Sequence, residues 1–523
     1  METQKSFFVP DWLEKRAQLS PERIALQDAA TGQELTYAAW NINANRTANY
    51  LRSLGVQRGD RVAVYATNSF AYLDIWHACG KIGAILQNLN WRLTIPEIAQ
   101  LLQDAAPVVL AYSAEYVEAV AQLRQDLPSV RHYIAVDEAT AAPNDQYLAE
   151  RATYPAILTE HPNLHPDDPW VICYTGGTTG LPKGAILTHS NMAWNSVNTV
   201  MSWGLTPDDV AILNAPLFHT GGLNVFTLPL IHIGGKSIVC KSFDADQVFD
   251  LIERAGVTLY FGVPTMFVVM QGHPRWQTAD FSRMKLVISG GAPCPLPIFE
   301  RFWVKSVDFK TGYGLTEAGP NTFWLPAADV RRKPGAVGFP LFHIDVKIVH
   351  RDGSLCGANE PGELLIRGPH VTPGYWNRPD ATTEAIRDGW LHTGDLATCD
   401  DEGYYTIVGR LKDMIISGGE NIYPAEIESA LHAHPAVEEA ALIGVPDEKW
   451  GEVGRAVVVL RPDQRTDEDT LKSFLETRLA KYKIPKSFVF VAELPKTGPG
   501  KIDKQALLAH YGASVPQQTN EST

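Results

Sequence analysis

The chain has 523 residues, of which 45% are hydrophobic and 20% charged, and its net charge is -14 with histidine neutral. This length exceeds what one hydrophobic core supports and predicts several domains of ~100–200 residues, while the composition excludes a disordered or fibrous protein. The negative charge disfavours nucleic acid and anionic membranes as partners, so any bound polyphosphate must be held by local cations.

The cysteines and the N-terminus bear on the compartment. The six cysteines lie far apart, and none forms a C-x-x-C pair typical of a metal or redox site. Charges and a proline interrupt the first residues before an apolar stretch reaches signal-peptide length, and no run approaches the ~18 apolar residues of a membrane span. The sequence therefore predicts a cytoplasmic protein without a membrane span.

Helix and strand patterns alternate through most of the first four hundred residues. Helices are predicted over residues 37–54, 71–85 and 297–305, and strands over 61–65, 108–112 and 285–288. This alternation predicts an α/β fold with largely parallel sheets. Residues 139–168, rich in alanine, proline and polar residues, are predicted to form a loop or linker.

The pattern changes in the last third of the chain. Between residues 329 and 408, short strands separated by Gly and Pro turns predict an all-β part. After residue 409 helix and strand patterns return, with Pro424 in the first turn of a helix. The predicted domains are therefore residues 1–411 and 412–523, of which 512–523 form a frayed tail.

A Gly- and Thr-rich segment follows a predicted strand at 170–174. Its candidate phosphate-binding residues are Thr175, Gly176, Gly177, Thr178, Thr179, Gly180 and Lys183. Glycines let backbone N–H groups approach phosphate oxygens, threonine hydroxyls donate, and the lysine supplies positive charge. The segment is not a Walker P-loop, because Pro182 stands where a glycine must precede the lysine, and a second run at 234–237 lacks the first glycine of that motif.

Two further segments offer polar groups to a nucleotide. The loop at 311–319 contains Glu317, and a carboxylate beside a phosphate loop requires an intervening cation, so this residue is predicted to bind Mg²⁺. Asp395 could accept hydrogen bonds from both hydroxyls of a ribose, and Arg410 could donate to the ribose or to phosphate.

Taken together, these segments and the run PKTGPGKIDK at 495–504 resemble the adenylate-forming superfamily of acyl-CoA synthetases, adenylation domains and luciferases. The similarity spans essentially the whole chain and includes the blocks GELLIRG, GYWNRPDAT and GGENIYPAEIE. It implies a large N-terminal domain of two α/β subdomains plus a β-barrel-like subdomain, followed by a small, mobile α+β C-terminal domain. Gly176 departs from the family, which usually has Ser or Thr there.

The resemblance also implies a role for each matching residue. The segment from Thr175 to Lys183 would wrap the β- and γ-phosphates of ATP, and Thr175 and Glu317 would hold Mg²⁺. Adenine and the α-phosphate would lie against Gly312, Tyr313, Gly314, Leu315 and Thr316, with the ribose on Asp395 and Arg410. Lys501 would bridge the acid and the α-phosphate, Lys412 would be the interdomain hinge, and Gly418 and Gly419 would line the tunnel for the pantetheine of CoA.

The acid is expected to bind near His219, which occupies the family position that packs over the reacting carboxylate. Gly222, Gly291 and Gly314 are further candidate contacts, and Gly221, Gly222 and Gly291 are expected to leave volume for the acid. An amino acid substrate is disfavoured, because His219 replaces the aspartate that pairs with its ammonium. No Lys or Arg occurs in 218–230 or 260–267, so the predicted acid is a fatty or aryl monocarboxylic acid.

The predicted reaction joins this small-molecule acid, ATP and CoA into acyl-CoA, AMP and pyrophosphate through an acyl-adenylate. Three alternatives stay open: loading of a carrier protein, a luciferase-like oxygenase, and a non-catalytic nucleotide-binding protein. A homodimer is kept as a candidate assembly.

Overall fold

The computed structural model describes residues 9–125, 127–137, 145–158, 160–175, 182–418, 420–496 and 502–513. The first sheet has the strand order β6 (His132–Ala135), β5 (Val109–Tyr112), β3 (Arg61–Tyr65), β4 (Ile85–Asn88), β7 (Pro169–Thr175) and β8 (Lys183–Thr188). Its strands are parallel except for β8, which runs antiparallel to β7. The apolar runs of β3, β4 and β5 are almost fully buried, as expected for a parallel sheet covered on both faces.

The second sheet has the order β13 (Phe309–Thr311), β12 (Leu286–Ser289), β11 (Leu259–Gly262), β9 (Val210–Leu213), β10 (Lys236–Val239), β1 (Ile24–Asp28) and β2 (Glu34–Thr36). It is parallel except for the β1–β2 pair. The two sheets therefore confirm the predicted α/β class.

Twelve helices accompany these sheets in the described part of the chain: α1 (Trp12–Leu19), α2 (Tyr37–Ser53), α3 (Phe70–Ile82), α4 (Ile95–Ala105), α5 (Val117–Leu123), α6 (Tyr147–Ala152), α7 (His189–Trp203), α8 (Thr220–Asn224), α9 (Thr227–Ile233), α10 (Ala245–Arg254), α11 (Pro264–Gly272) and α12 (Leu296–Val304). Local signals define several ends. Thr36 caps α2 by accepting from the N–H of Ala39, and Gly83, with φ of 74°, ends α3 before the predicted residue 85. Trp40, Trp76 and Trp170 are fully buried in the core beneath these helices.

The β-rich part is an antiparallel sheet. It has the order β16 (Asp345–Val349), β17 (Gly362–Arg367), β19 (Trp390–Cys399) and β18 (Ile386–Arg387), and β20 (Tyr405–Arg410) also pairs with β19. A separate pair is formed by β14 (Phe323–Trp324) and β15 (Phe339–Pro340). The prediction of an all-β region was wrong at one point, because α13 (Pro379–Ala385) interrupts it, with Pro379 in the first turn of that helix.

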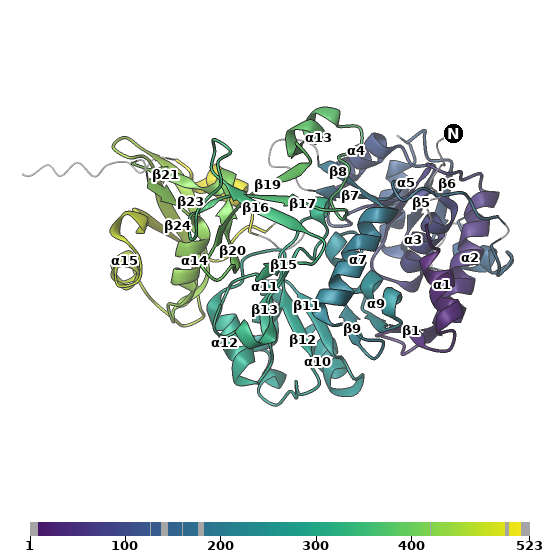
Figure 1. Cartoon of the computed structure of the whole chain (residues 1–523), viewed down its shortest axis with the longest axis horizontal. Helices are drawn as coiled ribbons and strands as arrows, with labels where there is room; N and C mark the ends of the chain where they lie inside the picture. The colour runs from purple at the N-terminus through teal and green to yellow at the C-terminus, as the bar shows by residue number, and fades with distance from the viewer. Residues whose placement is uncertain are drawn as a thin grey trace, which may run out of the picture.

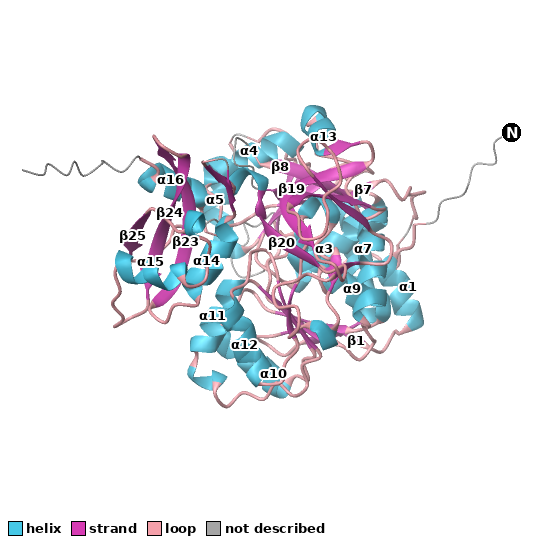
Figure 2. Ribbon diagram, turned by 60° about the vertical axis from the view of Figure 1, so that its left-hand side comes forward, coloured by secondary structure: helices cyan, strands magenta, loops and turns pink. Residues whose placement is uncertain are grey.

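The C-terminal part begins after a 3₁₀ turn, η6 (Leu411–Asp413). Its sheet has the order β22 (Glu420–Ile422), β21 (Ile415–Ser417), β24 (Gly451–Leu460) and β23 (Val437–Asp447), and β25 (Ser487–Val491) lies parallel to β24. The helices are α14 (Pro424–His432), α15 (Glu468–Glu476) and α16 (Lys504–Tyr511). Both views show this small α+β unit set beside the large N-terminal domain (Figure 1, Figure 2).

Two expectations about the chain need correction or limits. The predicted linker at 139–168 contains α6, which packs on α2 through a hydrogen bond of 2.6 Å between the hydroxyls of Tyr147 and Thr47. The predicted tail lies outside the described residues from 514 onward. None of the described helices combines the length and apolarity needed to cross a membrane.

Candidate active site

The hairpin of β7 and β8 positions the two ends of the predicted phosphate loop. Thr175 is the last residue of β7 and pairs with Lys183, the first residue of β8. The Thr175 hydroxyl donates to the Lys183 carbonyl at 3.3 Å. Gly176, Gly177, Thr178, Thr179 and Gly180 lie outside the described residues. The structure thus places the threonine and the lysine side by side at one edge of the first sheet.

Residues 372–376 connect this hairpin to the loop that carries Glu317. The N–H of Trp376 donates to the carbonyl of Gly184 at 2.8 Å, and the N–H of Ile186 donates to that of Gly374 at 3.0 Å. On the other side, the N–H of Thr372 donates to the Glu317 carbonyl at 2.7 Å. Two predicted site segments that are far apart in sequence are therefore joined by main-chain hydrogen bonds.

Glu317 lies in η4 (Thr316–Ala318) and is partly buried. Its Oε1 accepts a hydrogen bond of 2.8 Å from the Tyr375 hydroxyl. Burial raises the pKa of the Glu317 carboxyl, and the hydrogen bond from Tyr375 opposes that rise. The Lys183 ammonium lies 5.3 Å from the centre of the Tyr375 ring, so this tyrosine contacts both a predicted phosphate-binding cation and a predicted metal ligand.

The donor set around Glu317 fits Mg²⁺. Its carboxylate is a hard oxygen ligand, and no salt bridge to Glu317 is formed within the described chain. Among the described residues no cluster of three His, Cys, Asp or Glu side chains could hold a metal by itself. That arrangement suits Mg²⁺, which commonly binds one or two protein oxygens together with substrate phosphates and water.

Asp395 and Arg410 face each other on adjacent strands. They are register partners of β19 and β20, and Arg410 Nε lies 3.4 Å from Asp395 Oδ1. The Tyr313 hydroxyl donates to Asp395 Oδ2 at 2.7 Å. Burial and the nearby Asp395 carboxylate raise the pKa of Tyr313 well above its usual value, so the phenol stays protonated as a donor. The structure thus unites three predicted nucleotide contacts.

Residues 312–315 form the link between β13 and η4. Gly312 donates its N–H to the carbonyl of Ser289 at 2.7 Å, and Leu315 donates to that of Gly319 at 3.2 Å. Gly314 is required by packing, because a Cβ there would lie 2.3 Å from the carbonyl carbon and oxygen of Pro320. Thr316 begins η4 directly before Glu317. The predicted adenine segment is therefore a tightly folded loop.

Phe261 of β11 lines the same small cavity as the acyl candidate Gly222. His219 stands at the N-cap position of α8, and its ring lies 4.5 Å from that of Phe218. A Cβ at Gly221 would lie 3.2 Å from the Phe261 ring, and one at Gly290 would lie 3.0 Å from it. The phenyl ring therefore packs against two glycine surfaces.

The expectation that Gly222 leaves volume for the acid was wrong. A Cβ at this position would lie 2.3 Å from the Pro216 carbonyl oxygen, so the glycine accommodates the backbone of its own turn. The nearby cavity, lined by Gly221, Gly222 and Phe261 among others, measures only about 10 Å³, too little for an acyl group. Gly291 has φ of 81°, which favours glycine for conformational reasons.

The hinge and tunnel candidates lie at the start of the C-terminal part. Lys412 is exposed in η6, and this turn begins directly after Arg410, the last residue of β20. Gly418 has φ of 58°, and a Cβ there would lie 2.5 Å from the Trp450 ring. Gly419 and Lys501 lie outside the described residues.

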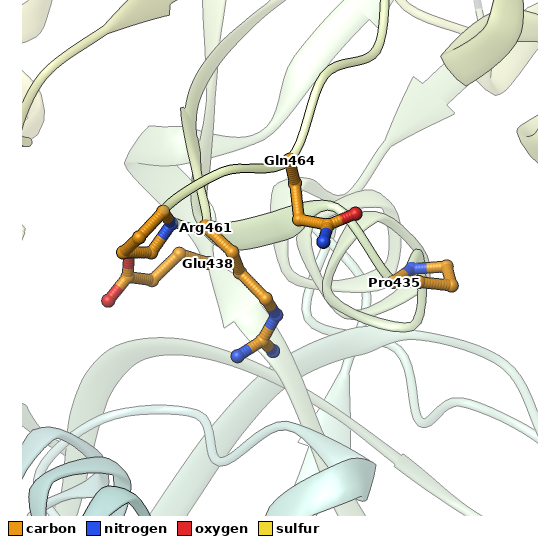
Figure 3. A pocket seen from close by; sticks show the side chains of 5 residues that line it. Pro435, Glu438, Arg461 and Gln464 are labelled. Carbon is orange, nitrogen blue, oxygen red and sulfur yellow. The ribbon is translucent and has the colours of Figure 1, made fainter.

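A wide hollow of about 380 Å³ opens on the C-terminal part (Figure 3). Its lining residues are Pro435, Glu438, Arg461, Pro462 and Gln464. It includes none of the predicted site residues and offers one cation beside one carboxylate, so it does not compete with the cluster around Glu317 and Asp395.

Comparison with known sequences decides the family. The sequence model of the AMP-binding enzymes matches residues 13–376, and that of the AMP-binding enzyme C-terminal domain matches 426–501. The chain belongs to the AMP-binding enzyme family.

Individual members of this family resemble the chain over nearly its whole length. A feruloyl-CoA synthase of Amycolatopsis sp is 44% identical over 96% of this chain and 98% of its own. The crystal structure of ATP-bound MatB from Rhodopseudomonas palustris superposes with a TM-score of 0.87 at 33% identity, covering 96% of this chain and 99% of that one. The anthranilate CoA ligase AuaEII, in complex with anthranoyl-AMP, gives a TM-score of 0.89 at 28% identity and covers 96% of each chain.

Two residues of this AMP-binding enzyme were missed by sequence reasoning as site candidates. Tyr375 lies in the block GYWNRPDAT, and Phe261 lies in the apolar stretch at 260–267. The sequence patterns of these two segments predict no role for either side chain. Their positions became apparent only through contacts with Glu317, Lys183 and the two glycines. The block itself was the one available signal for Tyr375.

Proposed function

We propose that the protein is an ATP-dependent acid–thiol ligase that converts an aromatic monocarboxylic acid and CoA into acyl-CoA, AMP and pyrophosphate. The observation that carries this proposal is the joining of three segments into one cluster. Lys183 and Glu317 meet on Tyr375, and Asp395 lies between Tyr313 and Arg410. These groups can bind a triphosphate, a cation and a ribose, which together make up a magnesium nucleotide.

The first half-reaction forms an acyl-adenylate. A carboxylate oxygen of the acid attacks the α-phosphorus of ATP, the bond to the bridging oxygen breaks, and pyrophosphate leaves. Negative charge accumulates on the α-phosphate, so preplaced cations lower the barrier. Lys183 and the loop residues that precede it hold the β- and γ-phosphates, while Lys501 bridges the acid and the α-phosphate. Thr175 and Glu317 would hold Mg²⁺, which would supply further charge neutralisation.

The second half-reaction transfers the acyl group. The sulfur of CoA attacks the carbonyl carbon of the adenylate, the bond to AMP breaks, and the thiol proton passes to solvent. The C-terminal domain, taken as residues 412–523, turns about Lys412 between the two steps, withdrawing Lys501 and bringing Gly418 and Gly419 to the acyl site. One site thereby serves two reactions, and AMP is the second product.

The aromatic class of the acid has two supports. The similar proteins include a feruloyl-CoA synthase and an anthranilate CoA ligase, both named for aromatic acids. In this chain the rings of Phe218 and His219 lie 4.5 Å apart, and Phe261 lines the same small cavity as the acyl candidate Gly222. Flat rings stack well on such a surface.

The acceptor, the compartment and the assembly are further parts of the proposal. CoA is preferred to a carrier protein, because the similar proteins cited above are named as CoA enzymes. A cytoplasmic location agrees with six cysteines that form no disulfide. A homodimer is retained as the candidate assembly, to be tested by sedimentation.

A panel of carboxylic acids tests the proposal. Benzoates, cinnamates, aryl acetates and fatty acids of increasing length are each incubated with ATP and Mg²⁺, and AMP release is scored with CoA, with acyl carrier protein, and without a thiol. Aromatic acids should give CoA-dependent AMP release. Release with the carrier protein alone would favour carrier loading, oxygen uptake with light emission would favour a luciferase-like reaction, and no acid-dependent AMP would contradict ligation.

A further inference from the structure

Tyr375 joins two predicted ATP-binding groups that come from separate elements. Its hydroxyl donates to Oε1 of Glu317 at 2.8 Å, and its ring lies 5.3 Å from the Lys183 ammonium. Glu317 lies in η4 and Lys183 begins β8, while Tyr375 lies in the segment between β17 and α13. One side chain therefore contacts both groups.

The backbone around Tyr375 is fixed on several sides. Tyr375 itself forms an antiparallel bridge with Ala185 of β8, and its N–H donates to the Thr382 hydroxyl at 2.9 Å. Three residues further on, Arg378 forms a salt bridge of 2.7 Å with Asp104 at the end of α4. A side chain on such a braced segment can hold its neighbours in place at little entropic cost.

Glu317 gains most from this restraint. The carboxylate sits on a flexible side chain with three rotatable bonds, and it makes no salt bridge within the described chain. A hydrogen bond from a fixed phenol to one oxygen orients the carboxylate and leaves the other oxygen available to a cation. At the same time the ring face offers the Lys183 ammonium a weak electrostatic contact that a phosphate can replace.

We infer that Tyr375 is a positioning residue for magnesium nucleotide: its hydroxyl orients Glu317 toward the cation, and its ring holds Lys183 near the phosphates. Its role in catalysis rests on the proposed function, since it acts through groups assigned to adenylation. Its role in nucleotide binding does not rest on the proposed function, because ATP binding is measured without any acid. A purely structural tyrosine would instead brace the 372–376 segment and affect all ligands alike.

Calorimetric titration of the full-length protein with ATP separates these two roles. Binding is measured with Mg²⁺ and again with a chelator, for the wild type, Tyr375→Phe and Tyr375→Leu. The matched control is Tyr404→Phe, which removes another tyrosine–carboxylate hydrogen bond, that of 2.6 Å to Asp329. Phe keeps the ring beside Lys183 and loses only the hydroxyl, whereas Leu loses both contacts.

The expected result is a selective loss of magnesium-dependent affinity. Tyr375→Phe should weaken binding of ATP with Mg²⁺ about tenfold, the size of a lost hydrogen bond to a charged group, and leave metal-free binding within about twofold. Tyr375→Leu should weaken both, because Lys183 also loses its contact. Tyr404→Phe should bind as the wild type does.

Two results would overturn the inference. One is unchanged binding of ATP with Mg²⁺ by Tyr375→Phe, and the other is an equal loss with and without the metal, which a structural role predicts. Circular dichroism of each variant shows whether it is folded. If the wild type binds the magnesium nucleotide but releases no AMP with any acid, the proposed function fails while the binding comparison still decides the role of Tyr375.

Discussion

Replacing Asp395 with Asn tests the ribose assignment, because it changes the charge of the carboxylate with little change in shape. The pair with Arg410 is partly exposed, since 52% of the Arg410 side chain is accessible, so losing it should cost only ~0.2–1 kcal/mol of folding free energy. The amide oxygen can still accept from Tyr313, so the free energy of unfolding should fall by no more than about 1 kcal/mol.

Nucleotide affinity should fall more than stability. A carboxylate that accepts from both ribose hydroxyls makes two charge-assisted hydrogen bonds, and Asn weakens each by ~1 kcal/mol, which together raise the Kd for ATP about 30-fold. Calorimetry with ATP and with 2′,3′-dideoxy-ATP isolates the contact. The wild type should lose roughly 100-fold on removal of the hydroxyls and Asp395→Asn only about threefold, so that both proteins bind the dideoxy nucleotide alike.

The matched control is Asp345→Asn, on the same β-rich sheet. Asp345 pairs with Arg367 at 2.7 Å, but both side chains are exposed and neither is a site candidate. This variant should bind both nucleotides as the wild type does. If Asp395→Asn binds ATP normally, or still shows the full penalty for the missing hydroxyls, Asp395 does not hold the ribose.

Lys501→Ala should lower adenylation at least ~10²-fold yet still convert supplied acyl-adenylate to thioester, and equal loss of both half-reactions, measured by rapid quench, would count against its assignment. Lys412→Pro should spare adenylation and block thioester formation, because proline fixes the φ angle that a hinge must change; normal overall turnover would exclude a hinge here. Phe261→Ala should shift kcat/KM from small aryl acids toward bulkier or longer ones, because removing the phenyl ring enlarges the adjoining cavity of about 10 Å³. An unchanged acid profile would show that Phe261 does not form a wall of the acyl site.

Local sequence patterns predicted most of the fold of the large domain. The predicted strand at 61–65 coincides with β3. The predicted helix at 37–54 ends one residue beyond α2, which Thr36 caps and whose inward residues recur at helical spacing. α6 was missed because its stretch is rich in alanine and proline and its position depends on Tyr147 contacting Thr47 in a distant helix. Tertiary contacts of this kind leave no periodic signal.

The candidate site was predictable as segments but not as an arrangement. The family blocks predict Glu317, Asp395 and Arg410 as site residues without a structure, yet the contacts among them depend on long-range packing. Tyr375 lies 58 residues from Glu317 in the sequence, and only the folding of 372–376 between β8 and η4 brings them together. For Gly222 the sequence predicts space for the acid where the structure has the backbone of a turn. A glycine can make room for a ligand or for the backbone, and composition alone cannot distinguish the two.

Oxygen isotope transfer tests the central claim, an acyl-adenylate intermediate, most directly. A cinnamic acid labelled with ¹⁸O in its carboxylate is converted with ATP and CoA, and the phosphate products are analysed by mass spectrometry. Attack of the carboxylate on the α-phosphorus leaves one of its oxygens on that phosphorus, so the AMP should carry one labelled oxygen and the pyrophosphate none. Label in inorganic phosphate, or unlabelled AMP, would contradict the account.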